Sequence, residues 1–136
     1  MDFAIDSNDY NHFAWRNNAN LQYLTTENSL NTILNAGNTQ NRPISIVIDE
    51  NDEPNIISVS SVNDLKFFFK SGNTWSWAYV GTITPYGSDA NLQIDSDNNP
   101  SILFHDSNNL GFAGLNFDDD DFYNSWDSCD NTFGES

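Results

Sequence analysis

The chain has 136 residues, enough for one ordinary domain, and its formal net charge is −16 at pH 7, with 20 acidic residues against 4 lysines and arginines. Binding to nucleic-acid phosphates or to an anionic membrane surface needs a basic footprint, so this composition excludes both functions. Membrane insertion is excluded as well, because no apolar stretch approaches the roughly 20 residues of a membrane-spanning helix.

Short apolar runs, rich in β-branched and aromatic residues, alternate with Asn, Asp, Ser, Gly and Pro along the chain. This alternation predicts strands joined by tight turns. No window sustains the i, i+3, i+4, i+7 apolar spacing of a helix. In chain order the predicted strands are 3–5, 13–15, 21–24 and 30–34, then 46–48, 56–59, 65–69 and 75–80, then 92–94, 102–104, 110–115 and a last one near Trp126.

One polar turn occurs three times, opening at Asp6, Asp49 and Asp95, each time between two predicted strands. A repeat of about 45 residues with four strands is typical of one β-propeller blade. We therefore expect an all-β fold of about three four-stranded antiparallel blade-like repeats. The repeats are residues 1–40, 41–86 and 87–117, the third being partial, and the acidic tail 118–136 could complete a blade.

The repeated turn has a predictable chemistry. Asp9, Asp52 and Asn98 hold its fourth position, where a sharp reversal needs a residue that tolerates a positive φ. The opening aspartate is expected to accept backbone N–H groups across the reversal, as in an Asx-turn. In this interpretation the acidic residues stabilise turns.

Calcium binding is the alternative for the same turns, and calcium is the only cofactor that the sequence indicates. Alternating oxygen-bearing side chains resemble the start of an EF-hand loop. However, Pro54 and Pro100 hold the sixth position, where that loop needs Gly, and strands flank the turn, so only a looser calcium loop is possible. Two sets share this spacing: Asp49, Asn51 and Glu53, and Asp95, Asp97 and Asn99.

A longer pattern indicates a family. The pattern Ile-Asp-x-x-[Asn/Asp]-x-Pro-x-Ile, then Leu-x-[Phe/Tyr], then Ser71-Gly72-Asn73-Thr74-Trp75, resembles the propeller repeats of large secreted bacterial and archaeal proteins. These are similar in appearance to the Asp-box repeats of sialidase-like propellers. The match covers most of residues 1–117 and is strongest over 44–80. Lys70–Trp75 lacks the Asp of a true Asp-box, and only Arg16 and Arg42 are present where sialidases need an arginine triad. The resemblance thus implies a propeller fold and no glycosidase activity.

The number of repeats predicts an assembly. Closed propellers have four to eight blades, and this chain supplies about three. Either the chain is a fragment of a longer propeller, or copies associate to close a ring, as two copies with six blades would. We expect self-association.

Aromatic residues are the best candidates for ligand binding. Trp75 and Trp77 are two residues apart, so they point to the same face of a regular strand. Tyr10 and Tyr86 lie in turn-like segments and are expected to be exposed. Aromatic faces beside amides and carboxylates suit sugar rings, whose C–H patches stack while their hydroxyls form hydrogen bonds.

Catalytic residues are few. His12 and His105, the only histidines, occupy different positions in their repeats and are expected to be isolated. No serine lies in Gly-x-Ser-x-Gly. We therefore expect no enzyme.

The expected function is that of a non-enzymatic protein, outside the cell, at a cell surface or in a virion, acting through binding or assembly. A structural or adhesion building block is the first hypothesis. A lectin-like module that recognises a glycan or a surface protein is the alternative, and a fragment of a glycoside hydrolase ranks last. The acidic, lysine-poor surface suits saline extracellular surroundings. No signal peptide is visible, since Met1 leads straight into a predicted strand.

Overall fold

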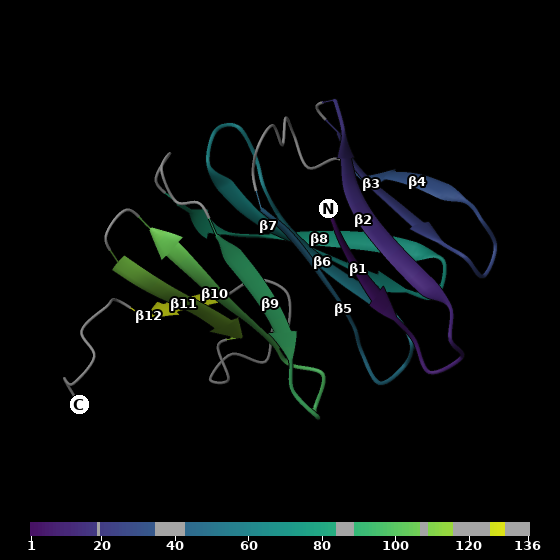
Figure 1. Ribbon diagram of the computed structural model, residues 1–136. Coiled ribbons are helices and arrows are strands. Elements are labelled where there is room, and N and C mark those ends of the chain that lie inside the picture. The colour runs from purple at the N-terminus through teal and green to yellow at the C-terminus, as the bar shows by residue number, and fades with distance from the viewer. Residues whose placement is uncertain (19, 35–42, 84–88, 107–108, 116–125, 130–136) are drawn as a thin grey trace.

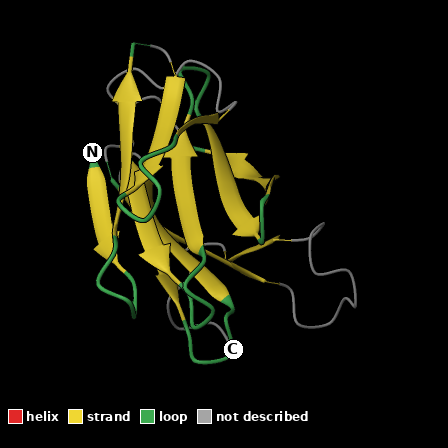
Figure 2. Ribbon diagram, turned by 90° about the vertical axis from the view of Figure 1, so that its right-hand side faces the viewer, coloured by secondary structure: helices red, strands yellow, loops and turns green. Residues whose placement is uncertain are grey.

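The computed structural model describes residues 1–136 except 19, 35–42, 84–88, 107–108, 116–125 and 130–136. Strands and their connecting turns make up the described residues (Figure 2), and no helix among them could span a membrane. The strands form three four-stranded antiparallel sheets (Figure 1). The prediction of an all-β fold with about three four-stranded repeats is confirmed.

Each sheet is a meander of four consecutive strands. Sheet 1 contains β1 (Asp2–Ile5), β2 (Asn11–Asn17), β3 (Asn20–Thr25) and β4 (Asn31–Leu34). Sheet 2 contains β5 (Ile44–Ile48), β6 (Pro54–Val59), β7 (Asp64–Ser71) and β8 (Thr74–Thr82). Sheet 3 contains β9 (Ala90–Ile94), β10 (Pro100–Asp106), β11 (Asn109–Leu115) and β12 (Trp126–Cys129). The last strand lies within the acidic segment 118–136 and pairs with β11.

The sheets stack face to face through their first strands, because β5 contacts β1 on one side and β9 on the other (Figure 1). Sheet 2 is therefore covered on both faces. Its strand β6 is buried at all six positions, although side chains of successive residues point to opposite faces. Two apolar cores result, one on each side of sheet 2.

The repeated turn joins the first two strands of every sheet, and its three copies have the same geometry. Asp9, Asp52 and Asn98 have φ angles of 64°, 60° and 62°. The Oδ1 atoms of Asp49 and Asp95 each accept two backbone N–H groups, at 2.9–3.0 Å and 2.9 Å. Oδ1 of the aspartate that opens the first turn accepts the N–H groups of positions 8 and 10, each at 2.9 Å. The predicted positive φ and the predicted Asx-turn are both confirmed.

Candidate functional site

A strip of aromatic side chains runs along β8, the outermost strand of sheet 2. Trp75 pairs with Lys70, Trp77 with Phe68 and Tyr79 with Lys66, so all three rings lie on the face that is directed toward sheet 1. Because β8 has 9 residues and β4 of sheet 1 has only 4, sheet 1 covers this strip incompletely. Trp77 is 53% exposed and Tyr79 is 52% exposed.

The buried end of the strip is anchored between the sheets. The ring of Trp75 packs edge-on against Tyr23 of β3, with 5.0 Å between the ring centroids. This contact fixes the indole and leaves a groove beside it, between β4 and β8. The groove has a volume of about 190 Å³ and is lined by Thr32, Ile33, Leu34, Phe68, Trp75, Ser76 and Trp77.

Two of the four basic residues of this acidic chain lie beside the strip. Lys66 and Lys70 are on β7, cross-strand from Tyr79 and Trp75. The ammonium nitrogen of Lys66 lies 4.7 Å from the ring centroid of Trp77, within the range of a cation–π interaction. The strip is thus locally much less acidic than the chain as a whole.

The structure brings together only two of the four aromatic residues that the sequence nominated. Trp75 and Trp77 lie on one face of β8, as their spacing predicted, and both line the groove. Tyr10 lies in the β1–β2 turn, is 38% exposed and does not line the groove. Tyr86 lies outside the described residues. Sequence reasoning missed Tyr79, which continues the same alternation by one step.

The acidic turns use their oxygens within the chain. Besides the backbone N–H groups at its Oδ1, Asp95 accepts the amide of Asn99 at Oδ2, at 3.3 Å, and Glu53 accepts the Gly72 N–H, at 2.9 Å. The N–H group of Asn99 lowers the pKa of Asp95 more than burial raises it, and that of Asp97 adds to the lowering. Within the described part of the chain, no three His, Cys, Asp or Glu side chains gather as metal ligands do. The calcium loop stays a prediction.

A buried polar network surrounds His12 and corrects the expectation that this histidine is isolated. Its Nε2 lies 3.0 Å from Oδ2 of Asp6 and its Nδ1 lies 2.7 Å from the hydroxyl of Tyr23. A carboxylate can only accept, so Nε2 carries a proton; in a neutral imidazole Nδ1 then accepts from Tyr23. Burial raises the pKa of Asp6, but the hydrogen bonds from His12 and two backbone N–H groups outweigh it and leave that pKa lowered. Burial raises the pKa of Tyr23.

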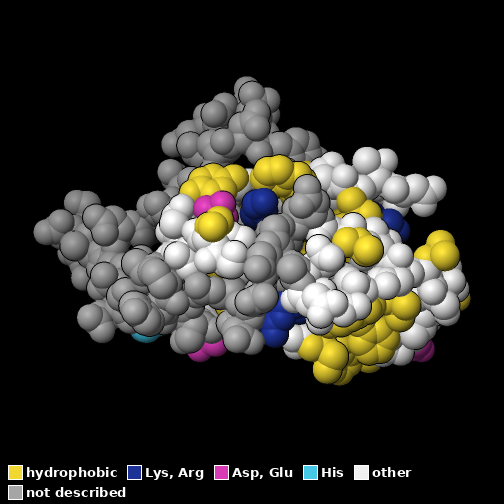
Figure 3. All heavy atoms as spheres, turned by 90° about the horizontal axis from the view of Figure 1, so that it is seen from above, with side chains coloured by type: hydrophobic (Ala, Val, Ile, Leu, Met, Phe, Trp, Pro, Cys, Tyr) yellow, Lys and Arg dark blue, Asp and Glu magenta, His cyan; other side chains and the backbone are white. Residues whose placement is uncertain are grey.

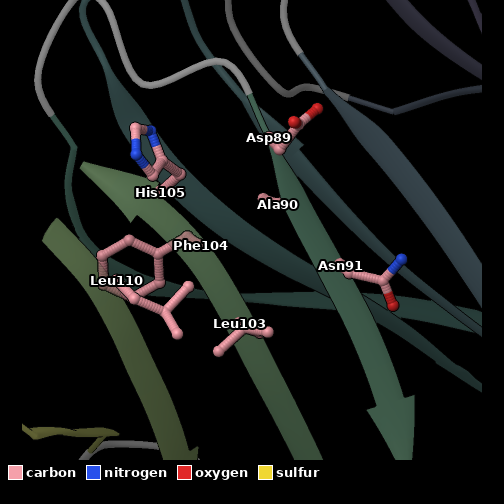
Figure 4. A pocket seen from close by; sticks show the side chains of 7 residues that line it. All are labelled: Asp89, Ala90, Asn91, Leu103, Phe104, His105 and Leu110. Carbon is pink, nitrogen blue, oxygen red and sulfur yellow. The ribbon is translucent and has the colours of Figure 1, made fainter. Parts of the chain in front are cut away.

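A second hollow lies on sheet 3, with a volume of about 440 Å³ (Figure 4). Asp89, Ala90 and Asn91 of the β9 side and Leu103, Phe104, His105 and Leu110 of β10 and β11 line it. His105 lies on β10 and is exposed. Four of its seven lining residues are apolar, and the polar ones do not converge on one point in Figure 4.

No protein-family profile matches the chain, and no curated protein matches it. Among solved structures, it is similar to the K499G mutant of the NanB sialidase from Streptococcus pneumoniae, with a TM-score of 0.58 and 19% identity. That likeness covers 91% of this chain but only 21% of the sialidase chain. A fucose lectin from Kordia zhangzhouensis, in complex with methyl-fucoside, gives a TM-score of 0.49 at 10% identity, over 94% of this chain and 96% of the lectin.

The sheets are propeller blades. The NanB sialidase has a propeller-type fold, and three stacked four-stranded meanders are what a segment of such a propeller contains. The propeller fold implied by the repeat pattern is confirmed. Its relation to Asp-box repeats stays a prediction. At this identity the likeness establishes the fold alone, since one fold carries many activities.

Proposed function

We propose that this chain is a non-enzymatic, carbohydrate-binding module that acts outside the cell, at a cell surface or in a virion. The observation that carries the proposal is the half-exposed pair Trp77 and Tyr79 on β8. Large rings are costly to leave in water, and exposed aromatic surface is a common mark of a binding site. A sugar ring can stack on these faces while its hydroxyls bond to polar groups at the groove margin.

The packing of blades against one another does not require an aromatic residue at the position of Trp77. Trp77 pairs with Phe68, and in sheet 3, whose equivalent face packs against sheet 2, the corresponding pair is Ala113 and Ser128. A position that takes either Trp or Ser needs no aromatic ring for blade packing. This difference between equivalent positions favours a role in binding for Trp77.

A non-enzymatic role is part of the proposal. Asp6, His12 and Tyr23 combine an acid, a base and a hydroxyl, but their side chains are buried, with Tyr23 only 3% exposed. Burial raises the pKa of Tyr23, which is the opposite of what a phenolic nucleophile needs. We infer that this network stabilises the first blade.

The test is a glycan array, followed by titration of the best-retained oligosaccharide with tryptophan fluorescence as the signal. Binding should perturb the fluorescence, and Trp77→Ala should weaken affinity about tenfold, since a stacked aromatic contributes on the order of 1 kcal/mol beyond its buried area. Tyr10→Ala is the matched control, an exposed aromatic outside the groove, and should leave affinity unchanged. A chain that retains no neutral or acidic glycan would contradict the proposal.

A further inference from the structure

The two blade-to-blade interfaces within the chain use the same faces of the repeat. One face of sheet 1 packs against sheet 2, and the corresponding face of sheet 2 packs against sheet 3. Counted from the opening aspartate of each turn, the positions recur in register. Phe3, Ile46 and Leu92 are equivalent on the face toward the preceding blade, and Ala14, Ile57 and Leu103 are equivalent on the face toward the following blade.

Within the described residues no sheet packs on the outer face of sheet 1, and this face is apolar and open. Phe3 is 59% exposed, whereas its counterparts Ile46 and Leu92 are 3% and 0% exposed. Phe13 and Phe3 pair across β1 and β2, with ring centroids 6.3 Å apart, so they form one continuous surface. A large apolar patch is visible on the right of Figure 3, the side on which Figure 1 places sheet 1.

No other described sheet packs on the outer face of sheet 3, and this face is open in the same way. Leu103 and Phe112 pair across β10 and β11 and are 47% and 41% exposed. Their counterparts Ile57 and Phe67 in sheet 2 are 0% and 6% exposed, because sheet 3 covers them. The hollow in Figure 4 borders Leu103 and lies where the next blade would pack.

Hydrogen bonds between neighbouring turns repeat as well. The N–H of Ser7 in the first turn donates to Oδ1 of Asp52 in the second, at 2.8 Å. The N–H of Glu50 in the second turn donates to Oδ1 of Asn98 in the third, at 3.2 Å. Each turn thus donates from its second position to the fourth position of the next turn.

This ladder has one open donor and one open acceptor. The donor is the N–H of Ser96 in the third turn, and the acceptor is the carboxylate of Asp9 in the first turn; neither bonds to any described residue. Ser96 matches Ser7, whose hydroxyl also bonds to Asp52, at 2.5 Å. The open donor and the open acceptor lie at opposite ends of the stack and complement each other.

We propose that a second copy of this chain occupies both open faces, so that blade 3 of each copy packs against blade 1 of the other. The interface continues the one that the chain already makes twice internally, with Leu103 and Phe112 against Phe3 and Phe13, and with Ser96 donating to Asp9. Closed propellers have four to eight blades, and six is the only multiple of three in that range. The assembly is therefore a two-fold dimer that closes a six-bladed ring.

One contact in this dimer is unfavourable, so a substitution that removes it should strengthen the dimer. Asn8 donates its side-chain amide to Asp52, at 3.2 Å, but the third turn has Asp97 at the equivalent position. Asp97 therefore places a carboxylate near Asp9 of the partner copy. Asp97→Asn restores the donor and should tighten the dimer, which few surface substitutions would do.

The experiment is light scattering on a sizing column over a range of concentrations. The chain should elute at twice its mass of 15.3 kDa and dissociate on dilution. Leu103→Asp should raise the dissociation constant by about tenfold or more, because it places a charge in an apolar interface. The control Val62→Asp introduces the same charge at a residue that is 67% exposed in the β6–β7 turn, outside both open faces, and should change nothing.

A second pair of variants keeps the test valid if Leu103→Asp fails to fold. In the Asp97→Asn background, where the repulsion between the two carboxylates is already removed, Asp9→Gly removes the acceptor while glycine keeps the positive φ, and it should weaken the dimer. Asn18→Gly is its control, at an exposed residue with a φ of 54° in another turn. A monomer at every concentration, an open-ended polymer, or a dimer that neither Leu103→Asp nor Asp9→Gly weakens would overturn the proposal. None of these results depends on glycan binding.

Discussion

At the scale of single residues, Tyr23 connects a polar network within blade 1 to an aromatic contact with blade 2. Its hydroxyl lies 2.7 Å from Nδ1 of His12, and its ring packs against Trp75 of the next blade. The aromatic anchor of the binding strip therefore depends on a buried polar network. This dependence makes the hydroxyl a useful probe of how the site is held.

Tyr23→Phe should lower the free energy of unfolding by about 1–3 kcal/mol, because it keeps the ring but leaves a buried imidazole nitrogen without its partner. Urea unfolding followed by circular dichroism at pH 7 measures the change. Tyr79→Phe is the control, since that hydroxyl bonds to Thr82 at the surface, and it should cost less than about 0.5 kcal/mol. Equal losses in the two variants would contradict the importance of the buried network.

The sequence could place Trp75 and Trp77 on one face because their spacing of two is a local rule of strands. It could not pair His12 with Tyr23, or Lys66 with Trp77. Those contacts depend on the register between strands, and the β7–β8 pairing shifts register between Leu65 and Lys66. Such a shift leaves no signal in the spacing of either strand.

At the scale of elements, the repeated turn is the unit that defines the blades. Its hydrogen bonds lie within five consecutive residues, which is why its geometry could be predicted from sequence. The bonds between turns, such as Ser7 to Asp52, join residues from different blades and follow only from the stacking of sheets. The same distinction holds for the two cores. The alternation of apolar residues along each strand is visible in the sequence, but the residues that they contact in the neighbouring sheet are not.

The turn also makes a prediction about pH. The N–H groups that Asp95 accepts lower its pKa below its usual 3.8 in the folded state. A lowered pKa stabilises the fold above the unfolded value, and this contribution is lost as the pH falls through the folded value. Asp95→Asn keeps an acceptor but loses the charge, so it should be less stable than the natural chain at pH 7, and the difference should shrink below about pH 4.

The measurement is the urea midpoint of both chains at a series of pH values from neutral to acidic. Glu27→Gln, which removes one negative charge at an exposed residue of the β3–β4 turn, controls for the change in net charge. A stability difference between Asp95→Asn and the natural chain that is constant across the series would mean that the charge of Asp95 contributes nothing to the turn.

At the scale of the whole molecule, repulsion among the acidic side chains opposes both folding and dimerisation. The net charge of −16 comes from 20 acidic residues and only 4 basic ones, and a dimer would bring two such chains together. Added salt screens these charges over a Debye length that falls from about 30 Å at 0.01 M to about 10 Å at 0.1 M. Salt should therefore stabilise the fold and tighten the dimer.

The form of the salt dependence separates screening from general salting-out. Screening should give most of the rise in melting temperature below about 0.15 M sodium chloride, where the Debye length changes fastest, and a plateau above it. Salting-out of apolar surface instead keeps growing at high concentration. Differential scanning calorimetry at fixed protein concentration measures the curve, and a variant with Glu27 and Asp97 both changed to amides should show a smaller rise. A curve that is linear up to high salt, or equally steep in the variant, would mean that burial of the apolar faces, and not charge, controls the response.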